Sequence, residues 1–101
     1  MIASFSILPI CGGCSLSGEV AKALEVVERS GLPYKLTAMG TELEGSWEQV
    51  MNVIKQCHDR LAKDNERLYM TIAIDDRRGG QGEIAGKVQS VEKKVGHALK
   101  K

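Results

Sequence analysis

The sequence lacks the features that mark several large classes of protein. No apolar run approaches the roughly 18 residues that a helix needs to cross a membrane, so we expect no membrane partner. The formal net charge is only +1, whereas a surface that binds a phosphate backbone normally carries a clear excess of basic residues. The sequence therefore argues against a membrane protein and against nucleic acid as the main partner.

A secretory signal is also missing at the N-terminus. The segment MIASFSILPIC has no basic region, and Ser4 and Ser6 interrupt its apolar residues. The chain has three cysteines, an odd number, and nothing in the sequence points to an oxidising compartment. We therefore expect a cytoplasmic protein whose thiols are mostly reduced.

The chain has little of what catalysis or metal binding requires. His58 and His97 stand without a second histidine or a carboxylate at a zinc-type spacing. No Ser/His/Asp or Cys/His arrangement is legible, and the Gly-rich segment after residue 75 matches no Walker pattern. The sequence therefore argues against an enzyme, and we expect no catalytic residue and no required cofactor.

What the chain does contain is a regular alternation of strand and helix patterns. Its 101 residues predict a single domain, residues 1–101, with one hydrophobic core. Strand patterns cover residues 2–10, 34–39, 41–45 and 67–75, and amphipathic helix patterns follow the first, third and fourth of them. This order, β-α-β-β-α-β with an additional C-terminal helix, predicts an α+β domain of the ferredoxin-like class.

The helix patterns have clear beginnings and apolar faces. Ser15 or Ser17 caps the first helix, and Ser46 with Gln49 forms a capping box before the second. The predicted apolar faces are Leu16, Val20, Ala23, Leu24 and Val27 in the first helix, Trp47, Val50, Met51, Ile54, Cys57 and Leu61 in the second, and Ile84, Val88, Val91, Val95 and Leu99 in the third.

The first strand has two chemically different faces. Ala3, Phe5 and Ile7 alternate with Ser4 and Ser6, so the two sets point to opposite sides of the sheet. Right-handed crossovers place both main helices on one side of a four-stranded antiparallel sheet. The other side is left bare and polar, and we expect it to take either a partner subunit or a ligand.

Two segments resemble a known family. YKLTAMGTELEGSWEQVMNVIK and IDDRRGGQGEIAGKVQSVEKKV together are similar to the small thiamine-binding proteins of bacteria and archaea, YkoF-like in the broad sense. The likeness covers nearly the whole chain. It implies a ferredoxin-like protomer that assembles through its sheets into a dimer, and commonly into a homotetramer. It also implies binding of thiamine (vitamin B1) or its hydroxymethylpyrimidine half, without known chemistry on it.

The resemblance assigns the ligand to the hairpin motif and the residues just beyond it. Asp75 and Arg77 occupy the second motif of the family. Two serines of the first strand are candidates to join the site from the neighbouring strand. The candidate ligand-binding residues are Thr37, Met39, Gly40, Thr41, Glu42, Glu44, Trp47, Ser4 and Ser6.

The chemistry of the hairpin residues suits such a ligand. An aminopyrimidine has a donor–acceptor edge and a flat aromatic face, and thiamine adds a permanently cationic thiazolium ring. Thr37 and Thr41 supply hydroxyls, Met39 an apolar wall, and Glu42 and Glu44 negative charge. The alternative is that these threonines reflect ordinary strand preference and that the glutamates are solvated charges at a sheet edge.

The loop after the last strand offers a candidate anion site. Arg77 and Arg78 precede Gly79 and Gly80, and an arginine pair near a helix N-terminus can hold a phosphate. A phosphorylated form of thiamine would suit such a site. The alternative is a solvated turn in which the arginines pair with the neighbouring aspartates.

The segment CGGC after the first strand is not accounted for by the resemblance. Cys11 and Cys14 adjoin the N-terminus of a helix, a position that favours the thiolate form. They are candidates for a redox pair or a metal clamp, or they are simply part of a turn that Gly12 and Gly13 make. Cys57 falls on an apolar helix face, where a free cysteine commonly acts as a small hydrophobic residue. The alternative function is therefore a thiol-redox or metal-binding protein.

Overall fold

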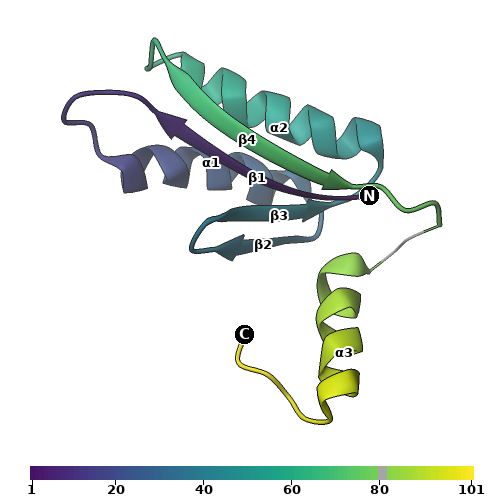
Figure 1. Cartoon of the computed structure of the whole chain (residues 1–101). Coiled ribbons are helices and arrows are strands. Elements are labelled where there is room, and N and C mark those ends of the chain that lie inside the picture. The colour runs from purple at the N-terminus through teal and green to yellow at the C-terminus, as the bar shows by residue number, and fades with distance from the viewer. Residues whose placement is uncertain (80–81) are drawn as a thin grey trace.

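The computed structural model describes residues 1–79 and 82–101 of the chain (Figure 1). The element order confirms the predicted ferredoxin-like pattern with its additional C-terminal helix. The elements are β1 (Ile2–Pro9), α1 (Leu16–Ser30), β2 (Tyr34–Thr37), β3 (Gly40–Glu44), α2 (Trp47–Ala62), β4 (Leu68–Asp75) and α3 (Glu83–Val95).

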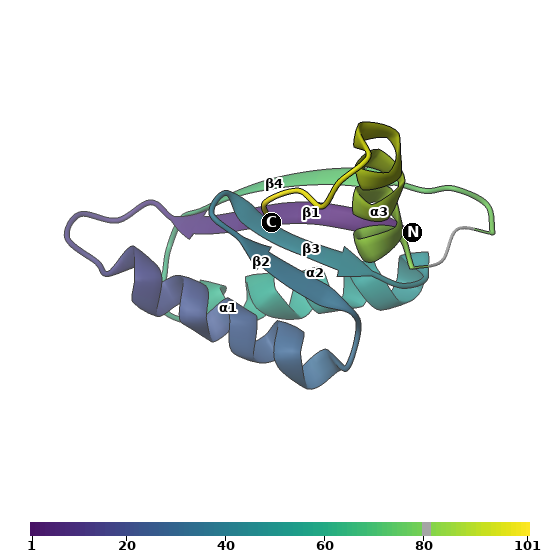
Figure 2. The same ribbon diagram turned by 90° about the horizontal axis from the view of Figure 1, so that it is seen from below.

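The four strands form one antiparallel sheet in the order β2-β3-β1-β4. Helices α1 and α2 lie side by side against one face, which we call the helix face, and α3 projects from the opposite side, the open face (Figures 1 and 2). The register places Phe5 opposite Thr41 on β3 and opposite Ile72 on β4. Since directly opposed residues point to the same face, these three side chains belong to the helix face.

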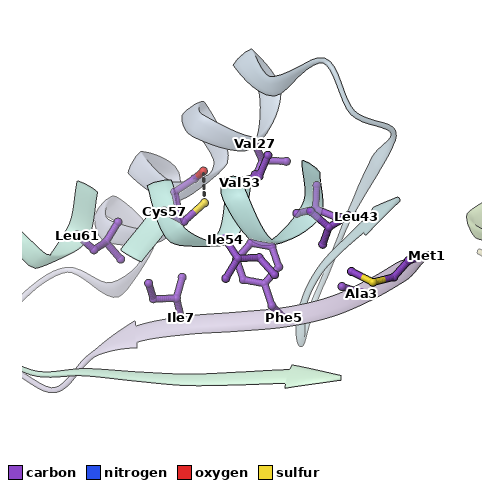
Figure 3. Packing of buried hydrophobic residues seen from close by; sticks show 12 residues of the cluster. Met1, Ala3, Phe5, Ile7, Val27, Leu43, Val53, Ile54, Cys57 and Leu61 are labelled. Atoms are coloured by element: carbon purple, nitrogen blue, oxygen red, sulfur yellow. Dashed lines mark hydrogen bonds between the residues drawn. The ribbon is translucent and has the colours of Figure 1, made fainter. Parts of the chain in front are cut away.

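The hydrophobic core lies between the helix face and the two helices (Figure 3). The predicted alternation of β1 is confirmed, because Ala3, Phe5 and Ile7 are buried while Ser4 is exposed. The buried apolar side chains are Met1, Ala3, Phe5, Ile7, Ala23, Val27, Leu43, Val50, Val53, Ile54, Cys57 and Leu61.

Two details of the predicted helix faces differ from the structure. Trp47 was expected on the buried face of α2, but it is the first residue of that helix and is 50% exposed. Val53, which the predicted face omits, is buried. The reason is geometric: α2 packs against both α1 and the sheet, so its buried arc is wider than one stripe and includes Val53, whereas Trp47 stands outside that arc at the helix start.

The helix termini follow the expected capping chemistry. Ser15 caps α1, and its Oγ accepts a hydrogen bond from the Gly18 N–H at 3.3 Å. The predicted capping box of α2 is confirmed: the Gln49 N–H donates to Ser46 Oγ at 3.1 Å, and the Ser46 N–H donates to Gln49 Oε1 at 2.9 Å. These local signals fix where both main helices begin.

Helix α3 is the exception to the core packing. None of its described residues is buried, and its apolar residues Val91 and Val95 are about half exposed. The predicted face also included Leu99, which lies beyond the helix end. Because α3 contacts mainly β3, its position depends on a few polar contacts at its N-terminus rather than on buried apolar area.

Candidate functional site

A cavity of about 310 Å³ lies between α1 and the tip of the β2–β3 hairpin; we call it the hairpin pocket. Its walls are mostly apolar, and its size matches the lower end of the range for small-molecule sites. Backbone and side chains of β1, α1 and the hairpin line it: Phe5, Ser6, Ile7, Leu8, Val20, Ala23, Leu24, Leu36, Thr37, Ala38, Met39, Gly40 and Thr41.

The polar residues of the hairpin have different roles at this pocket. Thr37 Oγ1 donates a hydrogen bond to the Gly40 carbonyl at 2.9 Å and accepts one from the Met39 N–H at 3.3 Å, so its hydroxyl holds the turn. Thr41 lies on the helix face, is only 4% exposed, and lines the pocket. Thr41 is therefore the hydroxyl best placed to meet a buried ligand.

Gly40 serves a structural purpose. A Cβ atom at this position would lie 2.7 Å from the carbonyl oxygen of Phe5, closer than a real side chain tolerates. Only glycine therefore allows β3 to lie this close to β1 at the mouth of the pocket.

The open face carries the polar residues of the first strand. Ser6 Oγ and Thr71 Oγ1 share a hydrogen bond of 2.7 Å across the β1–β4 pair. Ser4 lies opposite Glu42 on β3 and opposite Ala73 on β4. A shallow cavity of about 270 Å³, the open-face pocket, is lined by Ile2, Ser4, Glu42, Ala73, Ile74, Asp75 and Lys87.

An ion pair closes one side of the open-face pocket. Lys87 Nζ of α3 donates to Asp75 Oδ2 at 2.6 Å. This hydrogen bond, together with the lysine charge, lowers the pKa of Asp75 below its ordinary value, so the aspartate stays ionised to lower pH. Both side chains are about half exposed, and the pair therefore contributes little to stability.

The structure divides the predicted ligand residues between two pockets. Thr37, Met39, Gly40 and Thr41 line the hairpin pocket together with Ser6, whose hydroxyl is directed to Thr71 on the open face. In contrast, Ser4 and Glu42 line the open-face pocket, and the sheet separates the two. The cause is the two-residue period of a strand, which sends the neighbours Thr41 and Glu42 to opposite faces.

Glu44 and Trp47 belong to neither of these two pockets. Glu44 is 8% exposed, and its carboxylate accepts hydrogen bonds from the N–H groups of Glu83 at 2.9 Å and Ile84 at 3.4 Å. It replaces the side-chain cap that Gly82 at the N-cap of α3 cannot supply. Glu44 therefore holds α3 against the end of β3.

The loop after β4 contains the predicted anion-binding arginines. Arg77 and Arg78 are exposed, and Gly80 lies outside the described residues. A helix N-terminus was expected to help these arginines hold an anion, but the Glu44 carboxylate already occupies the N-terminus of α3. A role for these arginines in binding an anion therefore stays a prediction in which the N-terminus of α3 takes no part.

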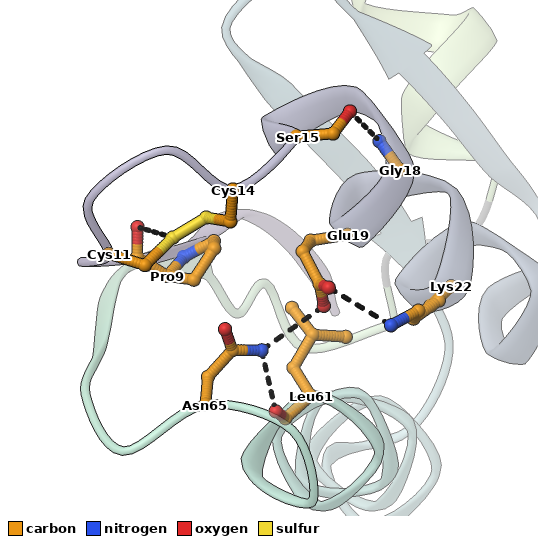
Figure 4. Close-up of a disulfide and its surroundings, with 9 residues drawn as sticks. All are labelled: Pro9, Cys11, Cys14, Ser15, Gly18, Glu19, Lys22, Leu61 and Asn65. Carbon is orange, nitrogen blue, oxygen red and sulfur yellow. Dashed lines mark hydrogen bonds and ion pairs between the residues drawn. A yellow bond between two sulfur atoms is a disulfide. The ribbon is translucent and has the colours of Figure 1, made fainter.

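The three cysteines lie in two environments. Cys11 and Cys14 are joined by a disulfide in the turn between β1 and α1 (Figure 4), which differs from the expected reduced thiols. Cys57 is fully buried in the core, where its Sγ donates to the Ala23 carbonyl at 3.5 Å (Figure 3). This burial raises the pKa of the Cys57 thiol to about 11.

Residues 1–79 and 82–101 contain neither a metal-binding cluster nor a membrane-spanning helix. No group of three or more His, Cys, Asp or Glu side chains in these ranges is arranged to hold a metal ion. His58 Nδ1 lies 3.1 Å from Asp59 Oδ1 in an exposed pair. Within the same ranges, no helix has the length and apolar composition needed to cross a bilayer.

Sequence reasoning missed several residues of the hairpin pocket. The sequence predicts only apolar-face positions for Phe5, Val20 and Leu24, and its strand pattern does not distinguish Leu36 from its neighbours. The one sequence signal that could have indicated Leu36 as a pocket residue was its apolar side chain in the strand pattern of the short hairpin. It was insufficient because only packing shows where a helix leaves a gap beside a sheet.

Comparison with known proteins gives a consistent result. A sequence model of the family described as thiamine-binding protein matches residues 3–92. A UPF0045 protein of Methanothermobacter thermautotrophicus is 35% identical over 97 residues, covering 92% of this chain and 97% of that protein. A UPF0045 protein of Methanocaldococcus jannaschii is 32% identical over 91 residues, covering 90% and 91%.

Solved structures agree. The crystal structure of a hypothetical protein from Methanocaldococcus jannaschii superposes with a TM-score of 0.81 at 32% identity, covering 89% of this chain and 93% of that one. A Thermotoga maritima protein that has been suggested to act in thiamine biosynthesis or salvage shares the fold, with a TM-score of 0.79 at 24% identity and coverage of 89% and 96%. The chain belongs to the thiamine-binding protein family.

Proposed function

We propose that the protein binds thiamine or its hydroxymethylpyrimidine moiety, without chemistry on it, and serves salvage, carriage or sensing in the cytoplasm. The observation that carries this proposal is that a sequence motif and a cavity, found independently, involve the same residues. The hairpin motif that resembles the family, Thr37 to Thr41, is also the segment that lines the hairpin pocket. Family membership over residues 3–92 supports the class of ligand.

The shape and lining of the hairpin pocket support the pyrimidine half of the ligand. Phe5, Leu24 and Leu36 provide apolar walls for a flat ring, and Met39, which is 89% exposed, adds a flexible apolar side chain to the lining. The Thr41 hydroxyl can donate to a ring nitrogen or accept from the exocyclic amine. A neutral aminopyrimidine thus finds both an apolar environment and a polar partner.

The distribution of charge supports the same preference. None of the residues lining the hairpin pocket is acidic, and Glu42 faces the other side of the sheet. A cationic thiazolium ring placed in this pocket would lose hydration without gaining an anionic partner. We therefore expect hydroxymethylpyrimidine to bind more tightly than thiamine to a single protomer.

The open face supports self-association into a dimer or tetramer. It carries the exposed Tyr69, and β4 is an unpaired edge strand of eight residues in the described protomer. Such an edge and face are commonly covered by a second subunit. Assembly on this side leaves the hairpin pocket, which opens on the helix side, free for ligand.

Isothermal titration calorimetry with hydroxymethylpyrimidine and with thiamine tests the proposal. The Thr41→Val variant removes the hydroxyl with little change of volume, and we expect it to weaken binding about tenfold. The matched control is Thr71→Val, the same chemical change on the open face, which we expect to bind like the unchanged protein. Absence of heat with both compounds, or an equal loss in the two variants, would contradict the proposal.

A further inference from the structure

The turn between β1 and α1, residues 10–15, carries a chemical group that the ligand site does not use. Cys11 and Cys14 form a disulfide there, and their Cα atoms are 5.9 Å apart, a separation usual for this bond. Cys11 is exposed and Cys14 is partly buried, so small molecules in solution can reach the pair. Gly13 has a φ of +88°, which turns the chain so that the two cysteines meet.

Cys14 is the better placed of the two to react. It directly precedes Ser15, the N-cap of α1, whereas Cys11 lies three residues earlier in the chain. The partial positive charge of a helix N-terminus stabilises a nearby thiolate, and the thiolate is the form that attacks a disulfide. The arrangement therefore gives one cysteine the role of nucleophile and the other the role of resolving thiol.

Cys57 provides a contrast within the same chain. It has no exposed surface, it donates its S–H to the Ala23 carbonyl, and burial raises its pKa to about 11. A thiol in this state neither ionises near neutral pH nor meets a reagent in the folded protein. Any thiol reactivity of the folded chain therefore comes from Cys11 and Cys14.

The same turn connects two walls of the hairpin pocket. Residues 5–8 of β1 and residues 20, 23 and 24 of α1 line that pocket, and residues 10–15 link the two elements. The first turn of α1, residues 16–18, is exposed and has little packing of its own. Beyond it, two polar contacts hold α1 near the end of α2. Lys22 Nζ lies 3.1 Å from Asp64 Oδ2. Asn65 Nδ2 donates to Glu19 Oε2 at 3.1 Å, as Figure 4 shows.

We propose that Cys11 and Cys14 are a reversible dithiol–disulfide couple that exchanges with small-molecule disulfides and restrains the start of α1 beside the hairpin pocket. The disulfide removes backbone freedom from a glycine-containing turn, and opening it restores that freedom. Any effect of this couple on ligand affinity rests on the proposed function. The redox couple itself and the restraint of α1 do not depend on that function.

The exchange is chemically balanced with a low-molecular-weight disulfide, RSSR, as the oxidant. The Cys14 thiolate attacks one sulfur of RSSR, forming a mixed disulfide and releasing RS⁻. The Cys11 thiolate then attacks Cys14 Sγ, forming the intramolecular disulfide and releasing the second RS⁻. The protein loses two protons and two electrons, and the oxidant becomes two RSH. Excess RSH reverses both steps.

The first measurement uses the ligand-free protein in buffers of defined ratios of oxidised to reduced glutathione. Free thiols are alkylated after equilibration and counted by mass spectrometry. We expect Cys11 and Cys14 to pass together and reversibly between labelled and unlabelled states, while Cys57 stays unlabelled unless the protein is unfolded. Failure of glutathione to interconvert the two states, or formation of disulfides between chains instead, would overturn the proposal.

The second measurement is hydrogen exchange of the amides of residues 16–24 in both redox states. We expect exchange about fivefold faster in the reduced protein, because the restraint on α1 is lost. The double variant Cys11→Ser/Cys14→Ser is the control, and its exchange should resemble the reduced protein and ignore the glutathione ratio. Equal exchange in the oxidised and reduced forms of the unchanged protein would refute the restraint.

Calorimetry with hydroxymethylpyrimidine then links the couple to the pocket. We expect about fivefold tighter binding in the oxidised form, a coupling at the lower end of the usual range. If no heat appears in either redox state, the proposed function fails while the exchange measurement still decides the redox restraint. If binding is equal in both states, the effect of the couple on the pocket is excluded.

Discussion

The two faces of the sheet differ in what holds them together. On the helix face, side chains from three strands and two helices pack into a continuous apolar core that includes Leu43. On the open face, the contacts are polar and few: Ser6 with Thr71, Lys87 with Asp75, and Glu44 with the start of α3. The comparison shows that one face of these strands packs into the core that stabilises the domain. The other face of the same strands is a surface with few contacts.

The largest expected effect comes from the helix face. Leu43→Ala removes a fully buried side chain between the sheet and its helices and should lower the free energy of unfolding by about 2–5 kcal/mol. Leu8→Ala, the same change on the open side of β1, should cost less than about 1 kcal/mol because Leu8 is 37% exposed. Urea unfolding followed by circular dichroism measures the free energy of unfolding of both variants. Similar losses of stability in the two would contradict the expected difference between the faces.

A pH-dependent loss is expected from Cys57, which is also on the helix side. Burial raises its folded pKa from 9.0 to about 11, so the unfolded chain releases this proton first as pH rises. The stability that the neutral thiol contributes is therefore complete below pH 9 and is lost between pH 9 and about 11, by about 1.4 kcal/mol at pH 10. Comparing urea midpoints of the unchanged protein and Cys57→Ala across this range isolates the effect. Parallel pH profiles would show that Cys57 is not the cause.

The smallest effect is expected from the open face. Glu44→Ala removes the carboxylate that caps α3 and should destabilise the docking of this helix by about 1 kcal/mol. Because α3 buries none of its described residues, the loss should appear as faster hydrogen exchange in residues 83–95 with little change in global unfolding. Glu42→Ala, a neighbouring carboxylate without such a contact, is the control. Unchanged exchange in α3 would show that another contact holds the helix.

Local sequence signals predicted most of the fold because they act over short distances. The capping residues Ser15 and Ser46 define where two helices begin, and the alternation of β1 assigns each of its residues to a face. The element order then leaves the ferredoxin-like arrangement as the natural way to bury those apolar faces. In contrast, the exposure of Trp47 and the burial of Val53 depend on which side of α2 packs against α1 and the sheet. Local sequence signals do not determine this packing.

The candidate site was predictable only in part. The hairpin motif indicated residues at the tip of β2 and β3 that line a pocket, but it grouped Thr41 with Glu42 and Glu44, which point to the opposite face. It also assigned Glu44 to a ligand, whereas its carboxylate meets the backbone of α3, 39 residues later in the chain. Which backbone N–H groups lack a hydrogen-bond partner becomes known only when the helices are placed in the fold. The sequence therefore could not predict this contact of Glu44.

The sequence by itself determined the strands, the helices and their caps, the ferredoxin-like order and the family, since each depends on residue type and spacing along the chain. Only the tertiary structure decided that a pocket opens between α1 and the hairpin, that Thr41 is buried in its lining, and that Cys11 and Cys14 meet in a disulfide while Cys57 is buried. These outcomes depend on which surfaces remain uncovered when elements pack. Contacts between residues far apart in the chain determine which surfaces are covered.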